Sequence, residues 1–429
     1  MRIIVWGINY APEQTGIAPY NTGLCEHLAQ AGHDTRMLTT FSYYPEWRKA
    51  EDDRRRIYRT DTIEAVRVHR CWHYVPARPD ALRRMIHEAT FVLASFVRFL
   101  TLPRCDVAVV VSPPLLLGAA AWIACALRRS RYVFHVQDMQ PDAAVMLGLL
   151  KPGKLTRLLY FLERLAHRRA SAVSGITPGM LSLFSAKGVP ADRQVLFPNW
   201  MPDLDGENSP RGVFRHTHGI SEDAFLAVYS GNLGKKQGLG AILDAAKLVR
   251  RASPGPATAS SRPIVFVIAG DGVEKPALAG RIEREGLTNV RLLPLLPKER
   301  YRELLIDADV CLVTQQPGSG SLFFPSKLLT ILAHGRPVVA VADPGGELEQ
   351  SIIEGGFGWS AIPGNAASFA RALDEAASNP AECDRRGECG AGWVRPFARG
   401  RVLADFEREL LLRFGEETRK ISSKPPSQR

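Results

Sequence analysis

The sequence lacks a C-x-x-C cysteine pair, a G-x-G-x-x-G loop and a Walker-type phosphate loop. The first absence argues against a zinc site, the second against a dinucleotide-binding dehydrogenase, and the third against a P-loop nucleotidase. Seven cysteines are scattered over 429 residues, which excludes a dense disulfide framework and is typical of reduced thiols in the cytosol. No paired-aspartate metal motif follows a strand. Helix-turn-helix, zinc-finger and RNP-type signatures are also missing.

Long apolar runs are scarce as well. The longest, residues 107–127, is interrupted by Ser112-Pro113-Pro114. A membrane-spanning helix needs about 20 apolar residues, so we favour a buried strand over 106–111 and a buried helix over 115–127, with a span as the alternative. Residues 1–7 have the pattern of a β-strand entering a glycine turn, without the regions of an export signal. We therefore expect a cytoplasmic protein.

Charge is unbalanced. Lysine and arginine number 55 against 44 acidic residues, a net charge of +11, while 45% of the residues are hydrophobic. The chain can bury sizeable cores, and its length suggests two or three domains. A basic surface favours an anionic partner: a nucleotide, a phospholipid surface or nucleic acid. The last would show steep salt dependence, and without a nucleic-acid motif we expect no nucleic acid.

Strand and helix patterns alternate along the chain, which indicates doubly wound α/β domains. We expect an N-terminal domain over 1–200, a C-terminal domain over 201–395, a helix over 396–415 that returns to the first domain, and a disordered tail over 416–429. The expected strands are 1–8, 35–40, 63–70, 106–111, 131–136, 173–177 and 194–197, then 225–229, 264–269, 290–293, 310–313 and 338–341. Helices are expected at 19–31, 82–100, 115–127, 154–169, after 178, and near 239–251, 274–286, 299–308, 326–334 and 366–377.

One stretch of the second half suits a diphosphate. The run Tyr229-Ser-Gly-Asn-Leu-Gly-Lys-Lys-Gln-Gly-Leu239 follows an apolar strand and precedes an amphipathic segment. Its glycines permit close approach of a ligand. A helix start and two lysines would supply N–H groups and positive charge. The alternative is a glycine-rich turn with solvated lysines.

Two helices combine apolar and basic residues. They are 82–100, with Arg83, Arg84 and Arg98 beside its apolar positions, and 154–169. Such helices suit an anionic membrane interface; the alternative is an ordinary core-facing helix with exposed arginines. The charged run 48–56 is either a solvated face or a contact for an anionic acceptor.

The motifs together resemble the GT-B glycosyltransferases of family 4, and more narrowly its branch in bacterial exopolysaccharide assembly, such as that of colanic acid. The resemblance runs from the first strand to about residue 360. It rests on Tyr10-Ala-Pro-Glu-Gln-Thr-Gly-Ile-Ala18, Ala31-Gly-His-Asp34, His135-Val-Gln-Asp138, Pro198-Asn-Trp200, Ser230 to Gly238, Ala269-Gly-Asp-Gly272, Phe324-Pro-Ser-Lys-Leu328 and Ala333-His-Gly-Arg-Pro-Val338.

The resemblance implies two Rossmann-like doubly wound domains facing each other across a cleft, with the donor nucleotide on the second and the acceptor on the first. It implies transfer of a sugar from a nucleotide diphosphate sugar with retention of configuration, without a cofactor or a metal. GDP-fucose is the donor it slightly favours, and a lipid-linked glycan at the inner face of the cytoplasmic membrane is the acceptor. A sugar-nucleotide epimerase or another nucleotide-sugar enzyme of the same fold is the alternative.

Residue roles follow from the same resemblance. Lys236 would compensate the charge of the leaving diphosphate, and Asp138 would orient or deprotonate the acceptor hydroxyl, with His135 as second candidate. The alternative for His135 is a core histidine. Donor contacts are implied at Gly16, Gly231, Asn232, Lys235, Lys236, Gly270, Asp271, Gly272, Leu295, Ser326, Lys327, Gly346 and Glu347.

The sequence departs from the family pattern at the donor side. Asn232 stands where an arginine is usual, and Gln237 where a lysine is usual. The common E-x7-E pair is missing, since Leu322 and Thr330 fall at its places and a Pro-Ser-Lys motif stands there instead. Gln137 occupies a slot where the family often has histidine.

Overall fold

The computed structural model divides into two compact units, Met1–Asn199 with Gly400–Arg429, and Trp200–Arg399. It describes the chain except Pro45, Pro79, Leu147, Leu149 and the segments 202–209, 253–261, 321–323 and 423–429. The sequence predicts a polar crossing between the domains over 203–222 and a Pro/Ser/Ala-rich surface insertion over 253–263. Leu322 and parts of both stretches lie outside the described residues. A five-residue helix, α7 (Val213–Thr217), follows in that crossing.

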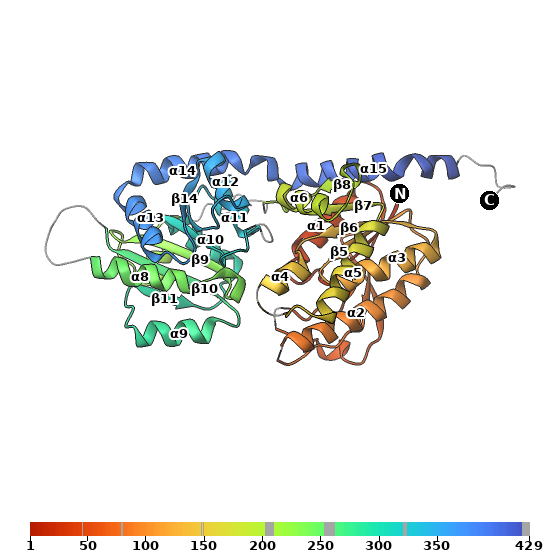
Figure 1. The fold of residues 1–429 in the computed structure, drawn as a ribbon, viewed down its shortest axis with the longest axis horizontal. Coiled ribbons are helices and arrows are strands. Elements are labelled where there is room, and N and C mark those ends of the chain that lie inside the picture. Colours follow the sequence, from red (N-terminus) through yellow and green to blue (C-terminus); the bar gives the residue numbers. More distant parts are fainter. Residues whose placement is uncertain are drawn as a thin grey trace. The chain divides into compact units, whose positions relative to one another are not determined.

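The first unit is built on an eight-stranded sheet in the order β3-β4-β2-β1-β5-β6-β7-β8 (Figure 1). All neighbours pair in parallel except β3 with β4. A parallel sheet is covered on both faces, which explains why every residue of β5 is buried. The strands are β1 (Arg2–Trp6), β2 (Asp34–Thr40), β3 (Tyr58–Ile63), β4 (Val66–Cys71), β5 (Val107–Ser112), β6 (Arg131–Val136), β7 (Ala172–Gly175) and β8 (Gln194–Leu196).

The single strand expected over 63–70 is confirmed over 66–70, in β4, but its start is wrong, because the structure has the hairpin β3–β4 there. Its turn residues, Glu64 and Ala65, have φ of 47° and 64°. The sequence hid this turn, since neither residue is the glycine or asparagine that usually marks left-handed backbone in a hairpin.

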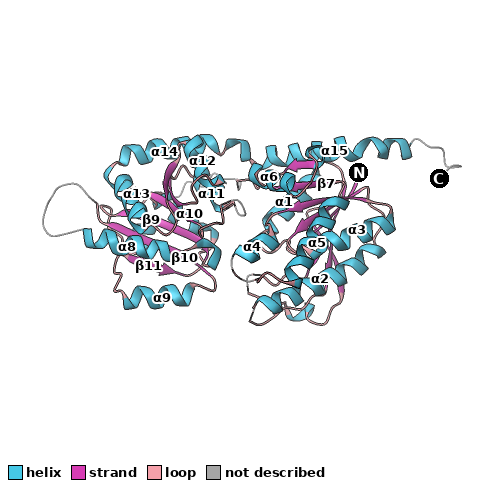
Figure 2. Ribbon diagram, in the orientation of Figure 1, coloured by secondary structure: helices cyan, strands magenta, loops and turns pink. Residues whose placement is uncertain are grey.

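Helices flank this sheet (Figure 2). They are α1 (Ala18–Gln30), α2 (Ala81–Thr101), α3 (Leu116–Arg128), α4 (Gln140–Met146), α5 (Lys154–Arg169) and α6 (Pro178–Ala186). Helix α3 packs against both α2 and α5. The strand-then-helix interpretation of residues 107–127 is confirmed by β5 and α3. In the described part of the chain, no helix is both long and apolar enough to cross a bilayer.

The second unit has a six-stranded parallel sheet in the order β11-β10-β9-β12-β13-β14. Numbered within the unit, that order is 3-2-1-4-5-6, the order of a Rossmann fold. Its strands are β9 (Phe225–Asn232), β10 (Ile264–Asp271), β11 (Val290–Leu293), β12 (Val310–Thr314), β13 (Val338–Val341) and β14 (Gly358–Ala361). Its longer helices are α8 (Gly240–Ala252), α9 (Lys275–Arg284), α10 (Lys298–Asp307), α11 (Lys327–Ala333), α12 (Glu347–Gly355), α13 (Ala366–Ser378) and α14 (Pro380–Trp393).

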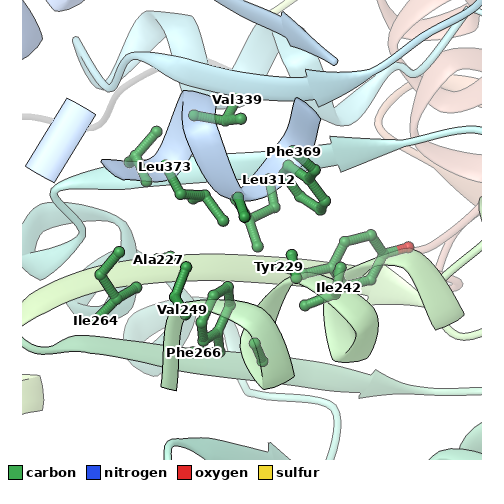
Figure 3. Close-up of a cluster of buried hydrophobic side chains, with 14 of the residues drawn as sticks. Ala227, Tyr229, Ile242, Val249, Ile264, Phe266, Leu312, Val339, Phe369 and Leu373 are labelled. Atoms are coloured by element: carbon green, nitrogen blue, oxygen red, sulfur yellow. The ribbon is translucent and has the colours of Figure 1, made fainter. Parts of the chain in front are cut away.

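Helices α8 and α13 pack together and, with one face of this sheet, enclose a hydrophobic core. Phe266 and Leu312 of the sheet meet Ile242 of α8 and Phe369 of α13 in this core (Figure 3). Tyr229 belongs to the same cluster, and its hydroxyl points away from the aliphatic side chains around it (Figure 3). The core therefore also holds the polar side chain of Tyr229, from the middle of β9.

Strand β14 and helices α12 and α14 were not expected from the sequence. Helix α14 contains Gly387 and Gly390, which lower helix propensity. A Cβ on Gly387 would lie 2.2 Å from the Gly335 carbonyl oxygen, and one on Gly390 2.7 Å from Leu332 Cδ2. The glycines of this helix are required by its close packing on α11 and the turn that follows it. Local helix propensity does not reveal such packing, so the sequence does not predict the helix.

The last helix, α15 (Arg399–Ser422), belongs to the first unit. Glu407 binds His27 Nε2 at 2.8 Å and His33 Nε2 at 3.1 Å, and Phe406 stacks on Phe197 with ring centroids 3.8 Å apart. The helix reaches Ser422, so the disordered tail expected over 416–429 overlaps it. Residues 423–429 lie outside the described chain.

Candidate functional site

Strand order locates a ligand site in the second unit. The chain leaves β9 towards β10 on one side and later enters β12 on the other, so the β9–β12 boundary is the topological switch point. Open parallel sheets bind ligands outside the carboxyl ends of the strands at such a point. The loops that follow the two strands touch, because Gln316 N donates to Lys236 O at 3.1 Å. The glycine- and lysine-rich loop thus lies at the place where the topology predicts a ligand.

The donor loop differs in detail from the expected helix start. Strand β9 continues to Asn232, and Lys235 to Gln237 form a 3₁₀ turn. Gly238 then takes left-handed backbone at φ 60°, and α8 begins only at Gly240. The two lysines therefore do not stand at the N-terminus of α8, because Gly238 separates their turn from the helix. Lys235 is exposed, Lys236 is half-buried, and Asn232 is exposed.

Two glycines of β10 and its following turn allow the strand ends to approach closely. A Cβ on Gly270 would lie 1.9 Å from the Gly231 carbonyl oxygen, and one on Gly272, at φ 152°, 2.5 Å from the Leu233 carbonyl oxygen. Gly231 itself has φ 137°. The glycines predicted to contact a donor are thus required by backbone packing. The Asp271 side chain between them is 73% exposed and accepts from Gly272 N at 2.8 Å.

Lys327 lies inside the switch point. Its Nζ is 3.4 Å from the centroid of the Tyr229 ring on β9. This nitrogen is buried, and no residue of the described chain gives it a hydrogen-bond partner. Burial lowers the pKa of Lys327 to about 7, while proximity to Cys311 raises it slightly. A buried cation without a hydrogen-bond partner marks a functional candidate.

The other predicted donor residues surround this point less closely. Ser326 is half-buried and makes no capping hydrogen bond, and Leu295 is 46% exposed. Gly346 caps α12 and Glu347 is its first residue. Sequence reasoning missed Asp343, whose carboxylate accepts from Gly318 N and Gly320 N, both at 2.9 Å. This contact ties the loop after β12 to the loop after β13.

In the first unit, His135 is a core residue by its contacts. Its Nδ1 lies 2.9 Å from Ser174 Oγ and its Nε2 2.9 Å from Gln137 Nε2. Burial lowers the pKa of His135 to about 3. Both ring nitrogens are occupied, so these contacts favour a structural role for His135. Asp138 follows the end of β6 and is half-buried.

A cavity of about 450 Å³ lies beside the loops that follow β1 and β2. Glu13 joins these loops, because its carboxylate accepts from Tyr43 N at 2.8 Å, Tyr44 N at 3.0 Å and Asn9 Nδ2 at 2.7 Å. Gly16 is exposed at φ 65° in the first loop. The cavity is lined by Pro12, Glu13, Gln14, Thr15, Ser42, Tyr43, Tyr44, Glu46, Arg48 and Ala50. Tyrosines beside acids and an arginine suit a polyhydroxylated ligand.

Outside the segments that the structure leaves undescribed, no group of three or more His, Cys, Asp or Glu side chains is arranged to hold a metal ion. All seven cysteines are free, and six of them are buried.

Comparison with known proteins settles the family. Residues 15–200 match the family described as "Glycosyl transferase 4-like domain", and residues 211–393 match "Glycosyl transferases group 1". A protein of Escherichia coli K12 named "Putative colanic acid biosynthesis glycosyl transferase WcaI" is 33% identical over 363 residues, which cover 82% of this chain and 85% of that protein. The chain belongs to this glycosyltransferase family. The resemblance drawn from the motifs is confirmed.

Solved structures give the same fold. Sucrose-phosphate synthase from Thermosynechococcus elongatus superposes with a TM-score of 0.72 at 16% identity, covering 97% of this chain and 99% of the other. Anabaena HepE in complex with UDP-glucose gives 0.67 at 16% identity, covering 96% and 99%. At such identities the likeness concerns the fold alone, and the predicted GT-B fold class of this glycosyltransferase is confirmed.

Proposed function

We propose that this glycosyltransferase moves a sugar from a nucleotide diphosphate sugar to a hydroxyl of a lipid-linked glycan in bacterial exopolysaccharide biosynthesis, with retention of anomeric configuration. GDP-sugars such as GDP-fucose are the slightly favoured donors. The observation that carries the donor class is that the switch point of the second unit has two lysines, each placed there by its own contacts. Lys236 lies in the loop after β9, and the Lys327 ammonium lies over Tyr229 of that strand.

The chemistry requires stabilisation of a departing diphosphate. Negative charge grows on the leaving phosphate as the bond to the sugar breaks, so fixed cations near that oxygen lower the barrier. Lysine ammonium groups and backbone N–H groups of a glycine-rich loop supply such charge without a metal ion. Support from relatives is consistent, since a protein of the same fold, HepE, is solved in complex with UDP-glucose.

The acceptor belongs, in this proposal, to the first unit. Asp138 follows β6 at the carboxyl edge of the parallel sheet, where a ligand of such a sheet binds. A carboxylate there can orient the acceptor hydroxyl and accept its proton. His135 instead holds Gln137 in place through the 2.9 Å contact between their side chains.

Membrane association is part of the proposal because the acceptor is lipid-linked. Helix α2 exposes Leu82, Ile86, Leu93 and Val97, which recur at helical spacing and form one stripe. Leu158 and Phe161 of α5 are also exposed. Arginines beside these residues on both helices match the charge of anionic lipids. These features support a peripheral position on the inner face of the cytoplasmic membrane.

The test of the donor class is a thermal-shift screen of the full chain with GDP, UDP and dTDP. A nucleotide that binds the native state raises the unfolding temperature by mass action. The nucleotide that binds is then supplied as its labelled sugar conjugate with vesicles that carry lipid-diphosphate glycans, and NMR of the product reports the anomer. Failure of every nucleotide to stabilise the chain, or an inverted product, would contradict the proposal.

A further inference from the structure

The Lys327 ammonium is buried without a hydrogen-bond partner among the described residues. Removing an ammonium group from water without a partner is unfavourable by several kcal/mol. The Tyr229 ring, with its centroid 3.4 Å from Nζ, returns part of this energy through a cation–π contact. The ring attracts the charge but provides no oxygen or nitrogen acceptor, so the N–H groups of the ammonium remain without a hydrogen-bond acceptor among the described residues. An anionic oxygen is the partner that would use it.

The surrounding structure holds this ammonium under the donor loop. The Tyr229 hydroxyl donates to Asn232 O at 2.8 Å, which fixes the ring at the end of β9. A Cβ built on Gly231 would lie 4.0 Å from Lys327 Cδ, so the lysine stem runs beside the glycine backbone. Both contacts lie at the β9–β12 switch point, where a parallel sheet binds its ligand. Burial and position thus indicate a ligand independently of one another.

We propose that the Lys327 ammonium binds a phosphate oxygen of the donor diphosphate and that the empty and occupied states of this site differ by one proton on Lys327. The inference rests on the proposed function, because it assumes a nucleotide diphosphate sugar as ligand. It assigns the buried lysine, in place of the exposed Lys235, as the side chain whose charge responds to the donor.

The proton follows from the surroundings. Burial lowers the pKa of Lys327 to about 7 in the empty site. The titratable groups that face it are Tyr229 on β9 and Cys311 on β12, and Cys311 also lies near Arg336. Burial raises the pKa of both the phenol and the thiol, so they stay protonated at neutral pH. A bound phosphate raises the pKa of Lys327 again, because an opposite charge favours the ammonium form.

The direction of the pH effect is then fixed. A group whose pKa rises on binding strengthens binding most below its pKa in the empty site, and the gain disappears as pH rises through the pKa in the occupied site. Lys327 should therefore take up close to one proton per donor bound at pH 8 and little at pH 6, because its pKa in the empty site is about 7.

Calorimetric titration of the full chain measures this proton. UDP-glucose and GDP-fucose are the probes, because their diphosphate diesters do not titrate near neutral pH. Repeating each titration in Tris and in HEPES, whose ionisation enthalpies differ, converts the difference in heat into protons taken up. Uptake close to one proton at pH 8 that falls towards zero at pH 6 supports the inference. Donor binding without uptake at pH 8 overturns it.

Variants separate this inference from the proposed function. Lys327→Met keeps the length of the side chain without its charge, so it should weaken donor binding roughly 10- to 100-fold and abolish proton uptake. Its unfolding temperature should be equal to or above that of the wild type, since an apolar group replaces an unpartnered buried charge. Lys154→Met is the matched control, since Lys154 is exposed on α5 of the first unit, and it should retain both donor affinity and the uptake.

A second variant covers the case in which Lys327→Met does not fold. Lys327→Arg keeps a permanent charge, so it should bind donor without proton uptake. A Met variant with wild-type affinity, or an Arg variant with full uptake, would overturn the assignment of Lys327 while the proposed function stands. Absence of binding of either nucleotide sugar to the wild type would overturn both.

Discussion

His167 offers a sharp test of how burial sets the pH dependence of stability in the first unit. The side chain lies on α5 at 2% exposure, with the rings of Phe134 and Phe184 at centroid distances of 5.9 Å and 5.3 Å. Neither ring nitrogen has a hydrogen-bond partner among the described residues. Burial, and then the nearby Lys187, lower the pKa of His167 to about 4. Replacing His167 by Phe removes this titrating group from an apolar site.

The magnitude follows from proton linkage. An unfolded histidine has a pKa of about 6.5, so below that pH the unfolded state binds a proton that the native state rejects. The contribution of neutral, buried His167 to the free energy of unfolding is fully present above pH 6.5 and is lost as pH falls towards 4. At pH 5 the wild type is about 2 kcal/mol less stable than at pH 8 on account of this residue alone. The stability of His167→Phe relative to wild type should therefore rise by about 2 kcal/mol from pH 8 to pH 5.

Urea unfolding at pH 8 and pH 5, with hydrogen exchange and mass spectrometry to separate the two units, measures this difference. A packing change caused by the larger Phe ring is the same at both pH values, so it cancels. His167→Leu should show the same pH difference with a different offset. Replacing the exposed His216 by Gln is the control. A stability difference that does not change between pH 8 and pH 5 would refute the argument that burial keeps His167 neutral.

Four further changes test the site and its surface. Lys236→Ala should lower kcat about 10- to 1000-fold with an unchanged unfolding temperature, because it removes charge compensation of the leaving group; unchanged kcat would exclude the residue from the mechanism. Asp138→Asn should depress kcat about 100-fold or more, measured with saturating donor and acceptor, and full activity would show that another group accepts the proton. Gly270→Ala should destabilise the second unit by about 3 kcal/mol or more, because its Cβ would lie 1.9 Å from the Gly231 oxygen; a wild-type urea midpoint would contradict this. Leu93→Glu should reduce flotation with anionic vesicles, since Leu93 is 68% exposed on the apolar stripe. Flotation equal to that of the wild type would show that α2 does not form the membrane-binding surface.

Much of the fold follows from apolar patterning, and the failures have physical causes. The predicted bounds of β6, β11 and β13 agree with the structure residue for residue. Strand β13 is the continuous apolar segment that a buried parallel strand requires, whereas β11 lies at the sheet edge and buries only Val290. Strand β14 was missed because Gly358-Trp-Ser-Ala361 is short and carries little β-branched character. Helix α14 was missed because its glycines argue against a helix locally. They are required by close contacts with Gly335 and Leu332, which are distant in sequence.

The candidate site shows a similar division. Composition and spacing found the loop with Lys235 and Lys236, because glycine and lysine mark a phosphate loop locally. The sequence also named Lys327 and placed it at a helix start, and the structure confirms this position, because Lys327 is the first residue of α11. Its burial over Tyr229 depends on strand β9, almost 100 residues earlier in the chain. The contact of His135 Nδ1 depends in the same way on Ser174 of the neighbouring strand β7, whereas Nε2 contacts Gln137, two residues along the chain.

Helix α15 has a consequence for the order in which the protein is made. It supplies Glu407 to His27 and His33, and Phe406 to Phe197, so it completes a unit whose other residues precede Trp200. A ribosome synthesises all of 200–399 before it reaches these contacts. The half that begins first is thus finished last, and the half inserted within it can reach its native state earlier. A chain that ends at residue 398 and is held on the ribosome by a linker long enough to clear the exit tunnel should therefore protect the second half from protease better than the first.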